Sequence, residues 1–123
     1  MWDGIDRRRF PRAHYKCLIR IMKREKSRPI ATYTENIGAG GLCVIVNENL
    51  GLFQGVSLEL DLEDTAGSRI ACTGTVVWVV RKREAGEKPK ELYDTGIEFI
   101  DIKEEDRKRI SVIVDGIIKK SSA

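Results

Sequence analysis

The sequence predicts an all-β domain of six short antiparallel strands followed by one C-terminal α-helix. Three observations support this prediction. Apolar and polar residues alternate with a period of two in several short stretches before residue 101. The links between these stretches are too short to hold crossover helices, which favours antiparallel order. The period changes to that of a helix only near the C-terminus.

The first three predicted strands lie in the N-terminal half. The first covers residues 15–21, where the odd positions are apolar and Lys16 and Arg20 alternate with them. A second short strand is predicted over residues 29–34. The Gly-rich loop of residues 38–41 then leads into the continuous apolar run of residues 42–46, which is typical of a central strand covered on both faces.

The other three predicted strands follow along the chain. Residues 56–63 alternate strictly between apolar and polar side chains, so this strand has one core face and one wet face. The next strand runs from about residue 69 to residue 80, and Gly74 near its middle indicates a bulge or a sharp bend. A long polar hairpin loop over residues 81–90 is expected to face solvent, and the last strand covers residues 92–100.

The predicted C-terminal helix begins after the last strand. Asp101 and Glu104 can form a capping box, in which the Asp101 carboxylate accepts from a free backbone N–H and Glu104 reaches back. The helix carries an apolar stripe at i, i+3, i+4 and i+7, formed by Ile110, Ile113, Val114 and Ile117. This stripe must pack on another element, and we expect it to dock on the strands.

Length and composition predict one domain, because 123 residues with 41% hydrophobic content can bury one core. The three cysteines, Cys17, Cys43 and Cys72, are odd in number and widely spaced, so we interpret them as small core hydrophobes rather than as disulfide partners or zinc ligands. No stretch approaches the roughly 20 apolar residues of a membrane span, and the N-terminus begins no signal peptide. We therefore expect a cytoplasmic protein without membrane insertion.

Catalysis is not supported by the sequence. The single histidine, His14, has no cysteine or serine placed beside it as a nucleophile, and a lone histidine is more often structural. The carboxylates lie on strand faces or in the helix, where solvation explains them. We predict that the protein is not an enzyme and holds no metal or cofactor.

Positive charge is concentrated in the first 28 residues, which hold ten basic against three acidic residues and so carry +7. The remaining 95 residues hold twelve basic against sixteen acidic residues and carry −4. An anionic partner is therefore expected to meet the N-terminal segment. Within it, Arg7, Arg8, Arg9 and Arg12 offer forked donors that match phosphate oxygens and the acceptor edge of guanine. The alternative is a basic segment that is only solvated or loosely attracted to polyanions.

A second polar segment, residues 36–41, has the sequence Asn-Ile-Gly-Ala-Gly-Gly. Asn36 has an amide able to recognise a base, and Gly38, Gly40 and Gly41 let the backbone approach a ligand closely. The alternative is an ordinary turn between two strands.

Together the two segments resemble the PilZ family, whose pattern is Arg-x-x-x-Arg in an N-terminal arm, followed after one or two strands by Asp/Asn-x-Ser-x-x-Gly. Arg8 and Arg12 match the first motif, and Asn36 and Gly41 match the second. The spacing between the motifs is also typical of the family.

The resemblance continues through Gly-Thr-Val-Val-Trp at residues 74–78 and Gly-Ile-Glu-Phe at residues 96–99, so it spans nearly the whole chain. It implies an all-β fold, a six-stranded antiparallel β-barrel of the PilZ split-barrel type with a C-terminal α-helix. It also implies a receptor for the bacterial second messenger cyclic di-GMP.

The resemblance further implies roles for individual residues. Arg8 and Arg12 would grip phosphates and guanine faces, and Asn36 would recognise a guanine edge. Arg7 would add a third clamp, which favours an intercalated pair of nucleotides over a single one. Trp78 matches a family position near the ligand, where its indole would pack against a purine. The alternative for Trp78 is a core position, because it shares the parity of Val76.

One residue departs from the family pattern, since Gly38 stands where the family usually has serine. The missing hydroxyl would cost roughly 0.5–1.5 kcal/mol, or about tenfold in affinity. The charged contacts of the arginines are expected to dominate the binding energy. The departure leaves open a degenerate PilZ-like module that binds a protein partner but not the nucleotide.

The expected mechanism is a switch in the N-terminal segment. Residues 1–12 would form a flexible Arg-rich arm that folds over the domain of residues 13–123 when cyclic di-GMP neutralises its arginines. The signal would pass to an unidentified downstream protein, and family members act in motility, exopolysaccharide production and virulence. A small nucleic-acid-binding barrel is a further alternative, ranked lower because no stacking motif lies on a strand.

Overall fold

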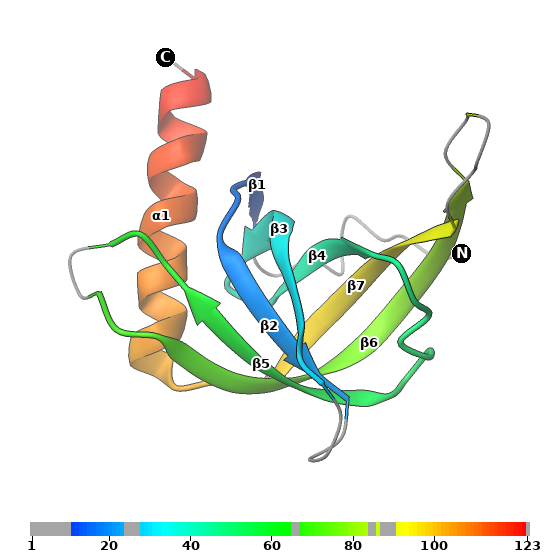
Figure 1. Ribbon diagram of the computed structural model, residues 1–123. Coiled ribbons are helices and arrows are strands. Elements are labelled where there is room, and N and C mark those ends of the chain that lie inside the picture. The colour runs from blue at the N-terminus through cyan, green and yellow to red at the C-terminus, as the bar shows by residue number, and fades with distance from the viewer. Residues whose placement is uncertain (1–10, 24–27, 65–66, 84–85, 87–90, 123) are drawn as a thin grey trace, which may run out of the picture.

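The computed structural model describes residues 11–23, 28–64, 67–83, 86 and 91–122. Within these ranges the chain forms seven strands and one helix (Figure 1). In chain order they are β1 (Arg12–His14), β2 (Leu18–Met22), β3 (Ile30–Gly38), β4 (Gly41–Val46), β5 (Gly55–Asp61), β6 (Ile70–Arg83), β7 (Glu91–Asp101) and α1 (Glu104–Ser122).

Strands β2 to β7 close a six-stranded antiparallel barrel. Neighbouring strands follow the order β3, β2, β5, β6, β7 and β4, and β4 pairs back with β3. The six-stranded barrel with a C-terminal helix is therefore confirmed. The short strand β1 pairs with β3 on the same edge as β2. It was not predicted, because three residues in an Arg-rich segment show no period.

The strand predicted over residues 15–21 is bent in the structure. β1 and β2 pair with the same edge of β3, β1 with residues 36–38 and β2 with residues 30–33. Thr34 holds the bend between them: the Cys17 N–H donates to Thr34 Oγ1 (3.0 Å), and the Thr34 N–H donates to the Cys17 carbonyl (3.0 Å). This bend directs Arg12 along the outer face of the barrel.

The core lies inside the barrel and follows the predicted alternation. Val56, Leu58, Leu60 and Leu62 are buried, and Cys17 and Cys72 belong to the same hydrophobic cluster. The opposite face of β5 is wet, and its carboxylates at residues 59 and 61 form ion pairs with Arg69. The alternating pattern of β5 therefore has the face assignment that its sequence predicted.

Strand β6 is longer than expected and contains two irregularities. One register shift lies at Thr73/Gly74, where the sequence predicted a bulge, and a second lies between Val76 and Trp78. The strand also continues to Arg83, so the polar residues 81–83, which were expected in the hairpin loop, belong to β6. Cross-strand ion pairs with β7, such as Arg81 with Glu91, support this extension.

The helix packs its predicted stripe on the barrel. Ile110 and Val114 are fully buried, while Ile113 and Ile117 pack against the core at its edge. The predicted cap is wrong by two residues: Asp101 ends β7, and the Lys103 carbonyl accepts the first helical bond, from the Arg107 N–H at 3.0 Å. The pairing of Asp101 with Thr73 in the sheet outweighs its preference for a helix cap.

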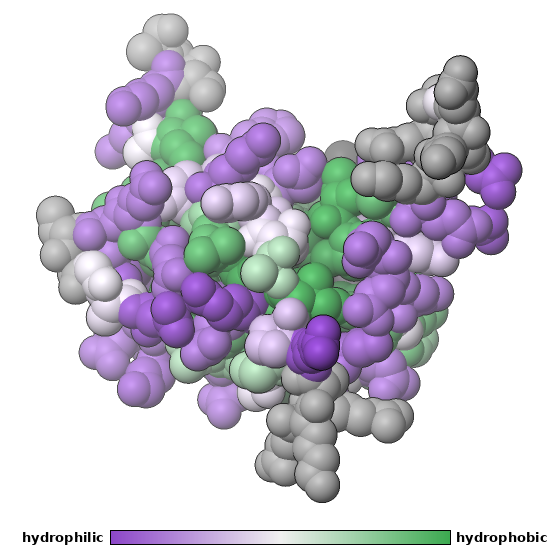
Figure 2. All heavy atoms as spheres, viewed as in Figure 1, coloured by the Kyte–Doolittle hydropathy of each residue, from purple (hydrophilic) through white to green (hydrophobic). Residues whose placement is uncertain are grey.

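The face of the molecule in Figure 2 is mainly polar. Figure 2 shows hydrophilic residues over most of one face, with hydrophobic residues between them mainly towards its middle. Among the described residues, no helix combines the length and the apolar character needed to cross a membrane.

Candidate functional site

The structure describes most of the residues that the sequence predicted for a binding site. Arg7 and Arg8, like Arg9, lie outside the described residues. The others come from four strands and a turn: Arg12 from β1, Asn36 and Gly38 from β3, Gly40 from the turn, Gly41 from β4 and Trp78 from β6. Strand pairing decides which of them meet.

Two rows of paired residues cross the outer face of the barrel over β1, β3, β4, β7 and β6 (Figure 1). The first row consists of Arg12, Gly38, Gly41 and Glu98. The second row consists of His14, Asn36, Cys43, Gly96 and Trp78. Paired residues share a face of a sheet, so both rows lie opposite the core residues Leu42 and Val44. Arg12, Asn36, Gly38, Gly41 and Trp78 therefore lie on the same outer surface.

Glycines form the floor of this surface. At Gly96 a Cβ atom would overlap the ring of Trp78, so the indole lies directly against the β7 backbone. At Gly38 a Cβ atom would overlap the carbonyl oxygen of Pro11 and lie 3.0 Å from Cγ of Arg12. The absence of side chains lets Trp78 and Arg12 lie low over the strands.

Arg12 and Trp78 meet above this floor. The guanidinium carbon of Arg12 is 5.4 Å from the centre of the Trp78 ring, within the range of a cation–π contact. Trp78 is half-buried and lies outside the hydrophobic core cluster, whereas Val76 and Val79 belong to it or pack on it. The register shift between Val76 and Trp78 reverses the parity of the strand, so the core alternative for Trp78 is wrong.

Asn36 carries an unused acceptor at the same site. Its Oδ1 atom is buried and has no hydrogen-bond partner among the described residues. A buried acceptor without a donor costs about 1–3 kcal/mol, so a ligand N–H that reached it would recover this energy. Asn36 lies opposite His14, two residues along the strands from the Arg12–Gly38 pair.

Cys43 and Asp94 belong to this surface and were missed as site residues. Cys43 is buried, as predicted, but it lies on the outer face and donates from Sγ to Asp94 Oδ1 at 2.7 Å. Burial, together with this hydrogen bond, raises the pKa of the Cys43 thiol to about 12. The apolar run around Cys43 concealed its position, and only the pairing with Asn36 and Gly96 reveals it.

The arrangement suits a planar ligand that carries both negative charge and N–H donors. The stacked pair of Trp78 and Arg12 provides a flat cationic surface, and Asn36 provides a buried acceptor. Among the described residues, no group of histidine, cysteine or carboxylate side chains is placed to hold a metal ion.

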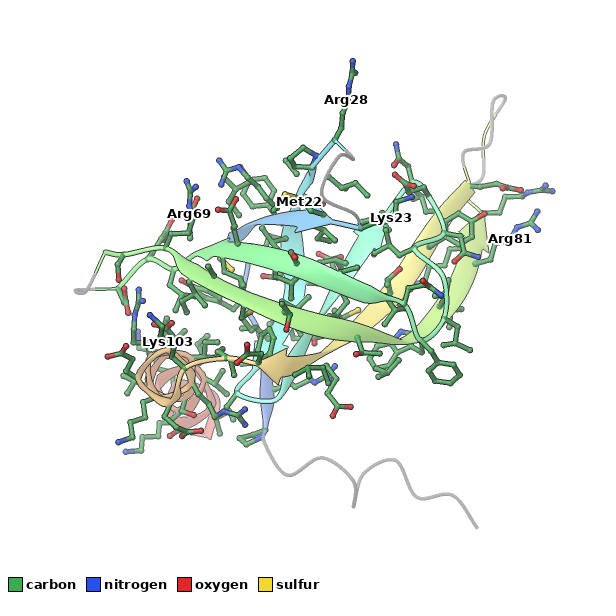
Figure 3. The ribbon with its side chains drawn as sticks, turned by 90° about the horizontal axis from the view of Figure 1, so that it is seen from below. Met22, Lys23, Arg28, Arg69, Arg81 and Lys103 are labelled. Atoms are coloured by element: carbon green, nitrogen blue, oxygen red, sulfur yellow. The ribbon has the colours of Figure 1, made fainter. Side chains whose placement is uncertain are left out.

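The strands β2, β5 and β6 carry a separate groove of about 670 Å³. Figure 3 labels Met22 and Lys23, which line one side of it. None of the predicted site residues that the structure describes contributes to this groove. We place the site on the other surface because the cation, the aromatic ring and the unsatisfied acceptor converge there.

The family model of the PilZ domain matches residues 6–116. No curated protein matches the chain. Among solved structures, the PilZ domain of YcgR from Escherichia coli with c-di-GMP has a TM-score of 0.67 and 10% sequence identity, with 94% of each chain covered.

Two longer proteins share the same fold. The MrkH–c-di-GMP complex of K. pneumonia has a TM-score of 0.72 and 18% identity, covering 94% of this chain and 53% of the MrkH chain. The inhibitor of motility MotI/DgrA from Bacillus subtilis has a TM-score of 0.69 and 21% identity, covering 94% of this chain and 51% of the MotI chain. The chain thus spans about half the length of these two proteins.

Proposed function

The chain belongs to the PilZ domain family, and from this premise we propose that it is a non-enzymatic receptor for cyclic di-GMP. The observation that carries the proposal is the convergence of Arg12, Trp78 and Asn36 on one outer surface. Two relatives in fold, YcgR and MrkH, are known in complex with c-di-GMP. No cofactor enters this function, and the protein acts in the cytoplasm.

Each described site residue has a task in this proposal. The Arg12 guanidinium stacks on a guanine and donates to a phosphate oxygen, because its fork matches both. Asn36 Oδ1 accepts from the N–H groups of a guanine edge, which satisfies its buried acceptor. Trp78 supports the stack from below. Gly38 and Gly41 are buried against Pro11 and β7, so of the three glycines only Gly40 leaves its backbone partly exposed to the ligand.

The remaining arginines complete the site from the N-terminal arm. Arg7 and Arg8 clamp the second phosphate and the outer guanine face, and their charge favours an intercalated pair of nucleotides. Ligand binding neutralises the arm and folds it over the barrel, so that arm and nucleotide form a new surface. A downstream protein recognises this surface.

Calorimetric titration with cyclic di-GMP tests the receptor function. The native protein is expected to bind saturably, while Arg8→Ala and Arg12→Ala each weaken binding by about tenfold or more, since each loses a charged hydrogen bond. GTP should not compete. Arg69→Ala is the matched control. It also removes one positive charge, but Arg69 pairs with Asp61 on the solvent-facing side of β5.

The stoichiometry of this titration decides between one nucleotide and two. Absence of binding at tens of micromolar protein would reject the receptor function and favour the adaptor that binds a protein partner without nucleotide. A nucleic-acid interface is disfavoured by the distribution of charge: Arg28, Arg69, Arg81 and Lys103 project from different sides of the barrel (Figure 3).

A further inference from the structure

We propose that Gly38 is a positioning residue that lets Arg12 lie across β3 and stack on Trp78. Its effect on binding rests on the proposed function, whereas its effect on the Arg12–Trp78 contact does not. Gly38 then replaces the family's serine for a structural reason, and the missing hydroxyl is not a loss of function.

The start of β1 approaches β3 closely at Gly38. Arg12 pairs directly with Gly38. A Cβ atom at position 38 would overlap the Pro11 carbonyl oxygen, which is backbone and cannot rotate away. Any other residue at position 38 therefore requires the start of β1 to move outward.

The aliphatic stem of the Arg12 side chain crosses Gly38. The same Cβ atom would lie 3.0 Å from Cγ of Arg12, so the side chain runs directly over the glycine. The low path of the stem brings the guanidinium to 5.4 Å from the centre of the Trp78 ring. A side chain at position 38 would lift the stem and move the guanidinium off the indole.

The β7 backbone at Gly96 supports the indole of Trp78. A Cβ atom at Gly96 would overlap the indole, so one ring face rests on β7 and the guanidinium covers the ring from the other side. Glycines at positions 38 and 96 thus seat both members of the stack. A cationic plane held in place before the ligand arrives loses less freedom on binding.

Serine and glycine at position 38 favour different contacts with the ligand, and these contacts differ in strength. Serine at position 38 would offer the ligand one neutral hydrogen bond, whereas a preorganised guanidinium offers charge-assisted bonds that are about twice as strong. Gly38→Ser is therefore expected to weaken binding, although it restores the family's residue.

The test uses the full chain with Trp2→Phe, so that Trp78 is the remaining tryptophan. Without ligand, Gly38→Ser and Gly38→Ala should both shift the Trp78 emission to longer wavelength, because the indole loses its guanidinium cover. Arg12→Met removes the guanidinium directly and supplies the reference spectrum. Gly55→Ser is the matched control, since a Cβ atom at Gly55 meets nothing within 4 Å.

Calorimetry with cyclic di-GMP provides the second readout. Gly38→Ser and Gly38→Ala are each expected to weaken binding by about three- to tenfold, the range of one cation–π contact. Unchanged emission in both variants, or tighter binding by Gly38→Ser, would overturn the proposal and support the missing-hydroxyl interpretation. If the native protein bound no cyclic di-GMP, the proposed function would fail, and the emission spectra would still decide the role of Gly38.

Discussion

At the scale of single residues, Thr34 hydrogen-bonds the backbone of the segment between β1 and β2. It is one of two buried polar residues among those that the structure describes. Its hydroxyl accepts from the Cys17 N–H and donates to the Tyr15 carbonyl, so it satisfies backbone groups that the bend between β1 and β2 leaves without sheet partners. Thr34 therefore links the core to the position of Arg12.

Thr34→Val is expected to destabilise the protein by about 1–3 kcal/mol, because it keeps the side-chain shape but leaves two buried backbone groups without their partner. Urea unfolding at neutral pH measures this difference. Thr95→Val is the matched control: Thr95 is equally buried, but its hydroxyl makes one 3.2 Å bond to the nearby Tyr93 carbonyl. An equal or smaller loss for Thr34→Val would contradict the bridging role.

At the scale of elements, α1 is fixed to the barrel by polar contacts as well as by its apolar stripe. The Arg109 guanidinium donates to both Asp64 oxygens, from Nε at 2.7 Å and from Nη2 at 2.9 Å. It also donates to the Ser68 carbonyl at 2.7 Å and to Asp106 at 3.2 Å. Both partners of the main pair are largely buried, with side chains 14% and 16% exposed. The contact joins the first turns of the helix to the segment between β5 and β6.

Arg109→Ala is expected to lower the free energy of unfolding by about 2–3 kcal/mol, because it leaves the Asp64 carboxylate without its charged partner. Arg69→Ala, at the exposed pair with Asp61, should cost much less, because water screens this pair. Urea unfolding of both variants makes the comparison. Equal losses would show that the helix docks through its apolar stripe alone.

The same pair predicts a pH dependence. Hydrogen bonds from Arg109 hold the pKa of the Asp64 carboxyl below its usual range. A carboxyl whose folded pKa is lowered contributes stability above its unfolded pKa of about 4, and this contribution is lost as the pH falls through the folded pKa. The stability difference between the native protein and Asp64→Asn should therefore be full at pH 6 and shrink below about pH 4. A difference independent of pH would exclude the ionised pair as its cause.

At the scale of the whole molecule, the barrel holds one half of the proposed site and the N-terminal arm supplies the other. Arg12 already belongs to β1 and lies on the barrel, so the boundary between arm and barrel lies before it. The arm residues 1–10, including Arg7 and Arg8, lie outside the described part of the chain. The proposed switch therefore consists of bringing these residues to a surface that Arg12, Asn36 and Trp78 already form.

Limited trypsin digestion tests this switch, because trypsin cleaves after arginine. Saturating cyclic di-GMP is expected to slow cleavage within residues 7–9 by about tenfold or more, since ordered segments resist proteolysis. GTP, which is not expected to bind, is the control ligand and should leave cleavage as fast as in the free protein. Cleavage unchanged by ligand that calorimetry shows to be bound would reject arm closure.

Local sequence patterns determined the elements and one part of the site. The period of two in residues 56–62 and the helical stripe from Ile110 to Ile117 depend only on which side chains avoid water, and both are confirmed. The Arg and Asn motifs predicted Arg12 and Asn36 as site residues, because the donors and acceptors of a side chain follow from the residue type alone. In the structure β1 pairs with β3, which places Arg12 opposite Gly38 and His14 opposite Asn36.

Tertiary structure alone decided which strands pair, in which register, and which face Trp78 and Cys43 occupy. A bulge of one residue between Val76 and Trp78 turned Trp78 away from the core, and a sheet contact kept Asp101 out of the helix cap. Cys43 and Gly96 joined the site through the register of β4 with its neighbours. The physical reason is that closing a barrel sets strand neighbours and registers over long sequence distances, whereas periodicity reports only the burial of each strand by itself.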